Sequence, residues 1–309
     1  MCQLKASIDL GTNTARLLIG SNLNGNIERR HISRVITRLG GGFSKDKGIS
    51  REAAQRTIAA LKEFSATLKT FNVTEFRAVA TSAVRDAVNR NEFCHEVKTA
   101  SGIELEIISG EEEGSLTLLG VRSGLDTTTQ TMLVFDIGGG STEYTVSQGD
   151  IILFTKSLPL GVVRLTEGKG THTAISDKID RELKLLLIEM DSAGIIPLIK
   201  DATLIATAGT ATTLAAIDIG LADYDYSKVN NHTLHADRIW EIYYRLSSLS
   251  PAERLSQVTG LEKGREDLII AGTLLTLKSM EMFASKSLKV SDFGLLEGII
   301  LDLYLPESC

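Results

Sequence analysis

The sequence predicts an α/β protein built from two copies of one unit, with a ligand cleft between the copies. Residues 6–20 and 131–146 each combine an apolar strand, an acid, a glycine-containing turn and a second strand. Three blocks also recur in the same order at nearly one spacing, which favours duplication over the chance similarity of short blocks. The paired positions are Asp9 and Asp136 (127 apart), Arg38 and Arg164 (126), and Ala80 and Ala208 (128).

The first half of the chain predicts three strands joined by turns, followed by helices that alternate with strands. Ser50 is a candidate helix N-cap, and apolar residues at helical spacing follow it from Ile58 to Leu68. The expected strands cover residues 6–9, 15–20, 27 onward, 75–80 and 103–108. The other expected helices contain Phe93 and Val97, or run from residue 109 toward Gly124.

The second half becomes mostly helical after Gly209. A glycine–threonine turn opens a helix at 210–219, whose N-terminus is a second candidate anion site. The other elements expected there are a helix at 239–249, a long apolar core helix at 267–283, a strand at 288–290 and a closing helix at 294–305. We place the first domain at 1–124, with 303–309 as a candidate extension, and the second at 125–302.

Composition narrows the class of protein. The chain has 309 residues, 43% hydrophobic and 23% charged, which is typical of a globular protein of about two domains. Its net charge of −6 disfavours a general nucleic-acid binder. Three scattered cysteines, Cys2, Cys94 and Cys309, suit free thiols in a reducing cytoplasm, and we expect no signal peptide and no membrane span.

The turn at residues 135–143 has the composition of a phosphate site. Gly138, Gly139 and Gly140 would let backbone N–H groups approach a ligand, because no Cβ intervenes. The side chains that flank them are two hydroxyls, Ser141 and Thr142, and two carboxylates, Asp136 and Glu143. Hydroxyl donors beside acids suit a phosphate with its divalent metal, although a tight hairpin with a glycine bulge is the alternative.

These blocks resemble the exopolyphosphatase/guanosine pentaphosphate phosphohydrolase (Ppx/GppA) family. The family is a branch of the actin-like, sugar-kinase and heat-shock-chaperone ATPase fold, so the resemblance implies two ribonuclease H-like domains. It runs nearly end to end, and it is most specific at 80–89 and 135–143. The other matching motifs lie at residues 8–14, 108–113, 157–165, 209–214 and 264–267. Longer members carry an extra helical domain, so this chain resembles the short, two-domain form.

The resemblance also implies roles for individual residues. It makes Glu113 the general base and Asp136 and Glu143 the acids that hold Mg²⁺ or another divalent cation or position water; Glu143 is also counted as catalytic. Expected contacts to substrate phosphate come from Asp9, Thr12, Asn13, Arg85, Gly138, Gly139, Gly140, Ser141 and Thr142. Arg164 and Arg265 are weaker candidates.

Several of these residues have simpler explanations. Glu111, Glu112 and Glu113 could form a solvated first helical turn, favoured by the helix dipole. Arg85 could make a surface ion pair with Asp86 or Glu92, and Asp9 could merely form a turn. The pair His232 and His235 has no third metal ligand nearby in the sequence, which favours two ordinary histidines.

The expected activity is hydrolysis of terminal phosphate from inorganic polyphosphate by an activated water. Hydrolysis of guanosine pentaphosphate, or a nucleotide or phosphate sensor without turnover, are the alternatives. The sequence does not determine the oligomeric state, and a homodimer is one of the states it allows. Two positions depart from the family pattern: Gly114 stands where many members have Ala, and Leu296 stands where Arg is usual, which removes one candidate phosphate or interdomain contact.

Overall fold

The computed structural model describes residues 3–23, 25–43, 46–126, 129–169 and 171–305. The chain divides into two compact units, residues 1–123 with 293–309, and residues 124–292. Cys2, Cys309 and the end of the candidate extension, 306–309, lie outside the described residues. Cys94 is a free thiol. Within the described ranges, no helix combines the length and apolar character that crossing a membrane requires.

Unit 1 contains a five-stranded sheet in the order β3-β2-β1-β4-β5. The first three strands form an antiparallel meander, and β4 and β5 continue the sheet in parallel with β1. Every residue of β1 is buried, as expected for a central strand. The strands are β1 (Lys5–Leu10), β2 (Thr14–Leu23), β3 (Asn26–Ile36), β4 (Phe76–Ala80) and β5 (Glu106–Ile107).

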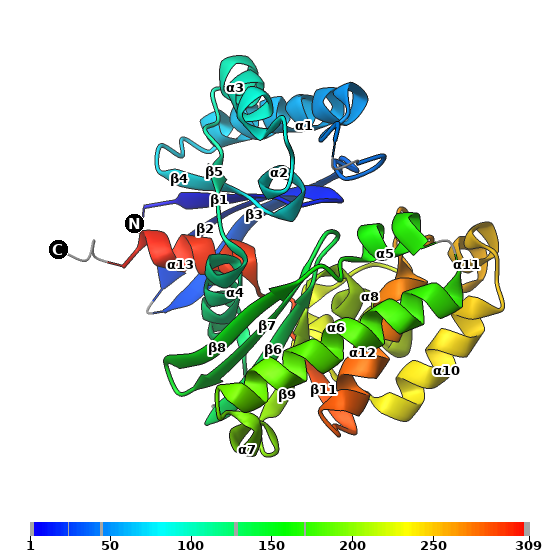
Figure 1. The fold of residues 1–309 in the computed structure, drawn as a ribbon. Helices are drawn as coiled ribbons and strands as arrows, with labels where there is room; N and C mark the ends of the chain where they lie inside the picture. Colours follow the sequence, from blue (N-terminus) through cyan, green and yellow to red (C-terminus); the bar gives the residue numbers. More distant parts are fainter. Residues whose placement is uncertain (1–2, 24, 44–45, 127–128, 170, 306–309) are drawn as a thin grey trace. The chain divides into compact units, whose positions relative to one another are not determined.

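Helices cover both faces of this sheet (Figure 1). On one face, α1 (Arg51–Thr70) and α3 (Arg90–Ser101) pack on the side chains of Ile8 and Leu17. Ser50 caps α1, since its hydroxyl accepts a hydrogen bond from the Ala53 N–H. The other helices of the unit are α2 (Ser82–Arg85), α4 (Gly110–Gly124) and α13 (Leu295–Leu303).

Unit 2 contains a six-stranded sheet in the order β10-β11-β9-β6-β7-β8. Its strands are β6 (Thr131–Ile137), β7 (Thr142–Gln148), β8 (Ile151–Leu158), β9 (Thr203–Thr207), β10 (Thr233–His235) and β11 (Ser287–Val290). Its helices are α5 (Val162–Lys169), α6 (His172–Ser192), α7 (Ile196–Ile199), α8 (Ala208–Ile219), α9 (Tyr226–Val229), α10 (Ala236–Ser247), α11 (Pro251–Gln257) and α12 (Ile269–Met282). In Figure 1, α6 and α12 run beside each other, and both belong to one large apolar core.

The two sheets share one topology. In each, three antiparallel strands are followed by two parallel ones, so β8-β7-β6-β9-β11 repeats the order β3-β2-β1-β4-β5. This is the ribonuclease H-like order, and the predicted fold class is confirmed. The blocks at Ala80 and Ala208 both join a parallel strand to a helix. The blocks at Arg38 and Arg164 differ, because Arg38 lies in a loop and Arg164 lies in α5.

The C-terminal helix lies with unit 1, whereas the domain boundaries predicted from the sequence put residues 125–302 in the second domain. Unit 2 ends at Asp292, and α13 packs on the sheet of unit 1. The cause is the apolar face of α13, whose Leu296 and Ile300 pack with Leu18 and Ile27. Leu296, at the position of the usual arginine, is therefore a core residue, buried to 5% exposure.

Other elements were missed or misjudged in extent. The strand expected at 103–108 is reduced to the two residues of β5, no bounds were predicted for α6, and β10 was not predicted. Helix α6 exposes Leu185 and Ile188 as well as burying Leu183 and Leu186, which blurs its amphipathic pattern. A three-residue strand such as β10 carries too little periodicity to be recognised.

Two glycines let α4 and α13 pack closely. A Cβ on Gly298 would lie 1.8 Å from the Leu116 carbonyl oxygen, and one on Gly120 would lie 1.8 Å from the Gly294 carbonyl oxygen. Both obstacles are backbone atoms, which cannot rotate away as a side chain can. The close packing of α13 on α4 therefore depends on glycine at these two positions.

We expect Gly298→Ala to destabilise the chain by about 1–3 kcal/mol, the usual cost of an extra methyl group in a packed core. Gly168→Ala is the matched control, since a Cβ there meets nothing within 4 Å in helix α5. It should be neutral or stabilise by up to about 1 kcal/mol. Urea unfolding followed by circular dichroism measures both, and equal midpoints for the two variants would contradict the close packing.

Candidate functional site

The turn between β6 and β7 is held by α5. The Gly138 N–H donates to the Ser141 carbonyl at 3.0 Å, and the carbonyls of Gly138 and Gly139 accept from the N–H groups of Val162 (3.0 Å) and Val163 (2.9 Å). Gly161 packs directly on the turn, because a Cβ there would lie 2.2 Å from the backbone of Gly140. The backbone of this turn is therefore fixed before any ligand binds.

Two groups expected to contact phosphate make internal hydrogen bonds instead. The hydroxyl of Thr142, which is fully buried, donates to the Leu160 carbonyl at 2.9 Å, and the Gly138 N–H is used within the turn. Among the donors expected in this turn, the N–H groups of Gly139 and Gly140 and the hydroxyl of Ser141 remain. Sequence alone does not show which groups of a glycine turn point inward.

Two acids face each other on the two strands that flank this turn. Asp136 on β6 is the cross-strand partner of Glu143 on β7, and the two residues are 7% and 2% exposed. Side chains of such a pair lie on the same face of the sheet. The next partner in this row is Ser157 on β8, whose hydroxyl donates to Glu143 Oε1 at 2.7 Å. From the sequence, Ser157 is only part of the motif at residues 157–165, with no predicted role.

The turn between β1 and β2 in unit 1 has the same closure and different chemistry. Its Gly11 N–H donates to the Thr14 carbonyl at 2.9 Å. The cross-strand partner of Asp9 is Arg16, and the guanidinium binds the Asp9 carboxylate through Nε at 2.9 Å and Nη2 at 2.5 Å. Asp9 is therefore neutralised within its own unit, by an arginine at the position where unit 2 has Glu143.

Thr12 and Asn13 follow Asp9 in this turn. The Thr12 hydroxyl lies 3.1 Å from the Ser82 hydroxyl, and since that bond uses only one of their two protons, the other remains available to a ligand. The backbone carbonyl of Asn13 accepts from the N–H groups of Thr37 and Arg38 at 3.0 and 2.9 Å. Its partly exposed side chain makes no hydrogen bond with any described residue. Ser82 was not singled out from the sequence.

The three glutamates at the start of α4 have three environments. Glu111 is exposed, and Glu112 binds Arg77 at 2.5 Å, while Glu113 is buried to 8% exposure. Successive helical residues point about 100° apart, so the three carboxylates point in different directions. The burial of Glu113 contradicts the alternative that all three glutamates form a solvated first helical turn.

Arg85 is the partner of Glu113. Its Nη1 lies 3.3 Å from Glu113 Oε2 and donates to the Ile108 carbonyl at 3.0 Å. The ion pair is therefore made with the buried glutamate, not with Asp86 or Glu92. The Nε and Nη2 donors of Arg85 make no hydrogen bond within the described parts of the chain, and its side chain is 22% exposed. They remain available to a ligand.

The remaining candidates in unit 2 have structural contacts. The guanidinium of Arg265 binds Glu262 at 2.8 Å and lies against Gly209, where a Cβ would be 1.6 Å from Nη1. His232 Nε2 lies 2.8 Å from Asp218. Burial raises the pKa of the Asp218 carboxyl, but hydrogen bonds from His232 and Arg238 outweigh it, so the net shift is downward. Over the described residues, no group of three or more His, Cys, Asp or Glu could hold a metal ion.

Curated relatives cover nearly the whole chain. Exopolyphosphatase 2 of Mycobacterium tuberculosis is 31% identical over 314 aligned residues, which cover 96% of this chain and 98% of the relative. The bifunctional 3-dehydroquinate synthase/phosphatase of Fusobacterium nucleatum is 32% identical over 97% of this chain. The chain spans only about half (46%) of the length of that second relative.

Solved structures agree with this similarity. The Aquifex aeolicus PPX-GPPA enzyme has a TM-score of 0.79 at 32% identity, covering 98% of this chain and 100% of that one. An exopolyphosphatase from Cytophaga hutchinsonii has a TM-score of 0.88 at 26% identity, covering 97% of each chain. Residues 19–307 match the Ppx/GppA phosphatase family as a whole. The resemblance noted from the motifs is confirmed, and this chain belongs to the Ppx/GppA phosphatase family.

Proposed function

We propose that this chain is an exopolyphosphatase that removes the terminal phosphate of inorganic polyphosphate by attack of a water molecule. The observation that carries the proposal is the contrast between two equivalent turns, one with the ion pair Asp9–Arg16 and one with the buried acids Asp136 and Glu143. The similarity to exopolyphosphatases over nearly the full chain supports the same reaction.

The acids Asp136 and Glu143 fit a divalent cation such as Mg²⁺. Two buried carboxylates on facing positions concentrate negative charge, which a bound divalent cation would stabilise. Magnesium is commonly held by one or two carboxylates together with substrate phosphates, so a cluster of three protein ligands is not required. When bound, such a cation would neutralise charge on the phosphoryl oxygens.

Glu113 is the group we assign to activate water. It is buried, and the contact with Arg85 Nη1 holds its carboxylate in one place, as a positioned base requires. The proton that water loses on attack would pass to this carboxylate. The Nε and Nη2 groups of the same arginine are left to bind phosphate oxygens, so Arg85 would serve both the base and the substrate.

The remaining donors would orient the polyphosphate chain. In unit 2 these are the N–H groups of Gly139 and Gly140 and the hydroxyl of Ser141, which lie on a turn fixed by α5. In unit 1 they are the spare proton of the Thr12–Ser82 pair and the side chain of Asn13. Preformed donors favour binding of phosphate because little reorganisation is needed.

The substrate assignment is tested by a profile assay. Phosphate release is measured from long-chain polyphosphate and from guanosine pentaphosphate at equal concentrations, with and without Mg²⁺. We expect higher kcat/KM for polyphosphate and loss of activity when EDTA removes the metal. A large preference for the nucleotide would replace polyphosphate by guanosine pentaphosphate as the substrate. Binding of either compound without any release would indicate a sensor.

The role of Glu113 is tested by Glu113→Gln, with Glu111→Gln as the matched control from the same helical turn. Since a positioned base contributes about 100- to 10,000-fold, we expect the first variant to lose at least about 100-fold in kcat. The control should keep wild-type activity, because Glu111 is exposed. Both variants should still bind polyphosphate. Full turnover by Glu113→Gln would remove this residue from the mechanism.

The role of Glu143 is tested by Glu143→Gln, which keeps the side-chain shape and an oxygen to accept the Ser157 hydrogen bond. We expect little change in the unfolding temperature of the metal-free chain. We expect a much smaller rise of that temperature on adding Mg²⁺ with phosphate, because one of two metal-binding charges is gone. A purely structural acid would give the reverse result, a lower unfolding temperature with an unchanged response to Mg²⁺.

A further inference from the structure

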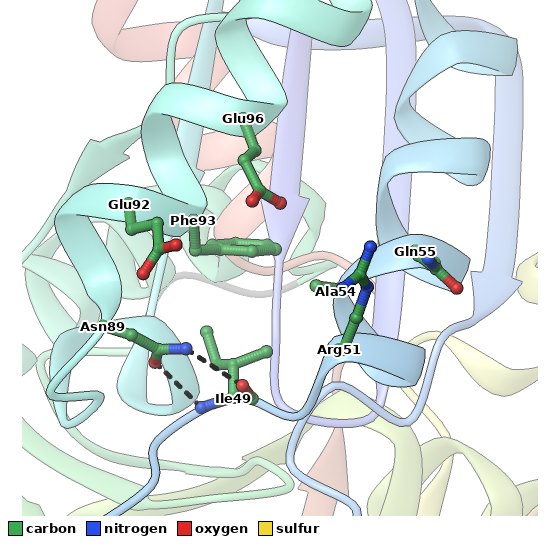
Figure 2. A pocket seen from close by; sticks show the side chains of 8 residues that line it. All are labelled: Ile49, Arg51, Ala54, Gln55, Asn89, Glu92, Phe93 and Glu96. Atoms are coloured by element: carbon green, nitrogen blue, oxygen red, sulfur yellow. Dashed lines mark hydrogen bonds between the residues drawn. The ribbon is translucent and has the colours of Figure 1, made fainter.

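Unit 1 contains a pocket between the start of α1 and the start of α3. It has a volume of about 330 Å³ and is lined by Ile49, Arg51, Ala54, Gln55, Asn89, Glu92, Phe93 and Glu96. Neither the turns nor Glu113 and Arg85 contribute to it, so the proposed hydrolysis leaves it unexplained. Figure 2 shows its side chains arranged around an open centre, with Arg51 and Gln55 on one helix and Glu92 and Glu96 on the other.

One end of the pocket is held rigidly. The side-chain amide of Asn89 makes two hydrogen bonds to the backbone of Ile49, accepting from its N–H at 2.9 Å and donating to its carbonyl at 3.0 Å (Figure 2). The preceding Gly48 has a φ of +68°, and a Cβ there would lie 2.1 Å from Asn89 Oδ1. The loop before α1 and the start of α3 are therefore tied together, which preforms the pocket.

The floor is apolar and the walls are charged. Ile49, Ala54 and Phe93 are buried, at 4%, 9% and 2% exposure, and Figure 2 shows the Phe93 ring with the Glu92 carboxylate beside it and the Glu96 carboxylate above it. An apolar floor between charged walls suits a ligand with a methylene stem and charged ends.

The charges on the two walls are not compensated by each other. The side chains of Arg51, Glu92 and Glu96 make no ion pair or hydrogen bond with any residue that the structure describes. Arg51 is also the first residue of α1, where the positive end of the helix dipole adds to its guanidinium. One wall therefore favours an anion and the other favours two cationic groups.

We propose that this pocket binds a basic α-amino acid of the lysine or arginine type. Such a molecule carries one carboxylate and two cationic groups, which matches one guanidinium and two carboxylates in number and sign. Its carboxylate would face Arg51, its cations would face Glu92 and Glu96, and its methylene stem would lie over Phe93. The proposal is independent of polyphosphate hydrolysis, because none of these residues belongs to the proposed site.

Calorimetric titration of the full chain with L-lysine and L-arginine tests this. We expect saturable binding with a Kd of about 1 mM or below. Cadaverine lacks the carboxylate of lysine and L-norleucine lacks its terminal ammonium, so both should bind at least about threefold more weakly. No saturable binding up to about 10 mM, or equal binding of cadaverine and lysine, would overturn the proposal.

Variants identify the pocket as the place of binding. Arg51→Gln should weaken binding of L-lysine by about three- to fivefold and leave binding of cadaverine unchanged. Glu96→Gln should weaken binding of both ligands, as expected for single exposed charge pairs. The controls are Lys62→Gln and Glu63→Gln, exposed residues of α1 outside the pocket, which should bind L-lysine as the wild type does. If Arg51→Gln and Lys62→Gln have the same effect, the assignment of the carboxylate to Arg51 is wrong.

Discussion

The hydrogen bond that closes each strand turn determines the chemistry of both units. In unit 1 it joins the Gly11 N–H to the Thr14 carbonyl, and in unit 2 it joins the Gly138 N–H to the Ser141 carbonyl. This hydrogen bond sets the register of the two strands that the turn joins. As a result, Asp9 faces Arg16 in unit 1, and Asp136 faces Glu143 in unit 2. A single difference at that facing position, arginine in one unit and glutamate in the other, gives an ion pair or a pair of acids with the same backbone.

Side-chain ion pairs determine the environment of Glu113. Arg77 on β4 binds Glu106 at 2.8 Å, Glu112 at 2.5 Å and Asp302 at 2.9 Å, which ties α4 to β5 and α13. The hydrogen bonds that Arg77 donates to the Glu106 carboxylate are the main cause that raises the pKa of Arg77, and the same bonds lower the pKa of Glu106. With Glu112 occupied by this network, the next residue of the helix turns toward Arg85. The sequence Glu-Glu-Glu thus divides into an exposed, a structural and a buried carboxylate.

The sequence was informative where a pattern is local or repeated. The strand–acid–glycine turns, the spacing of 127 residues and the capped helix at Ser50 are local signals, and they predicted the class and the central strands correctly. Three kinds of feature were out of reach. The place of α13 depends on Leu296 and Ile300 meeting Leu18, a contact between distant segments. The internal bonds of Thr142 and Gly138 depend on side-chain and backbone direction, and short elements such as β10 have too few residues to show a period.

The charges of the pocket between α1 and α3 differ from those of the turns in burial and pairing. At Asp9 the charge is buried and neutralised by Arg16, so replacing Arg16 would remove the ion pair of a buried carboxylate. Arg51, Glu92 and Glu96 are exposed and separate, so each is solvated and contributes little to stability. Charges that the fold does not require can be exchanged without unfolding the chain. A loss of ligand binding on replacing these residues would therefore show that they recognise the ligand. Replacing Asp9, in contrast, would change ligand binding and the stability of the fold together.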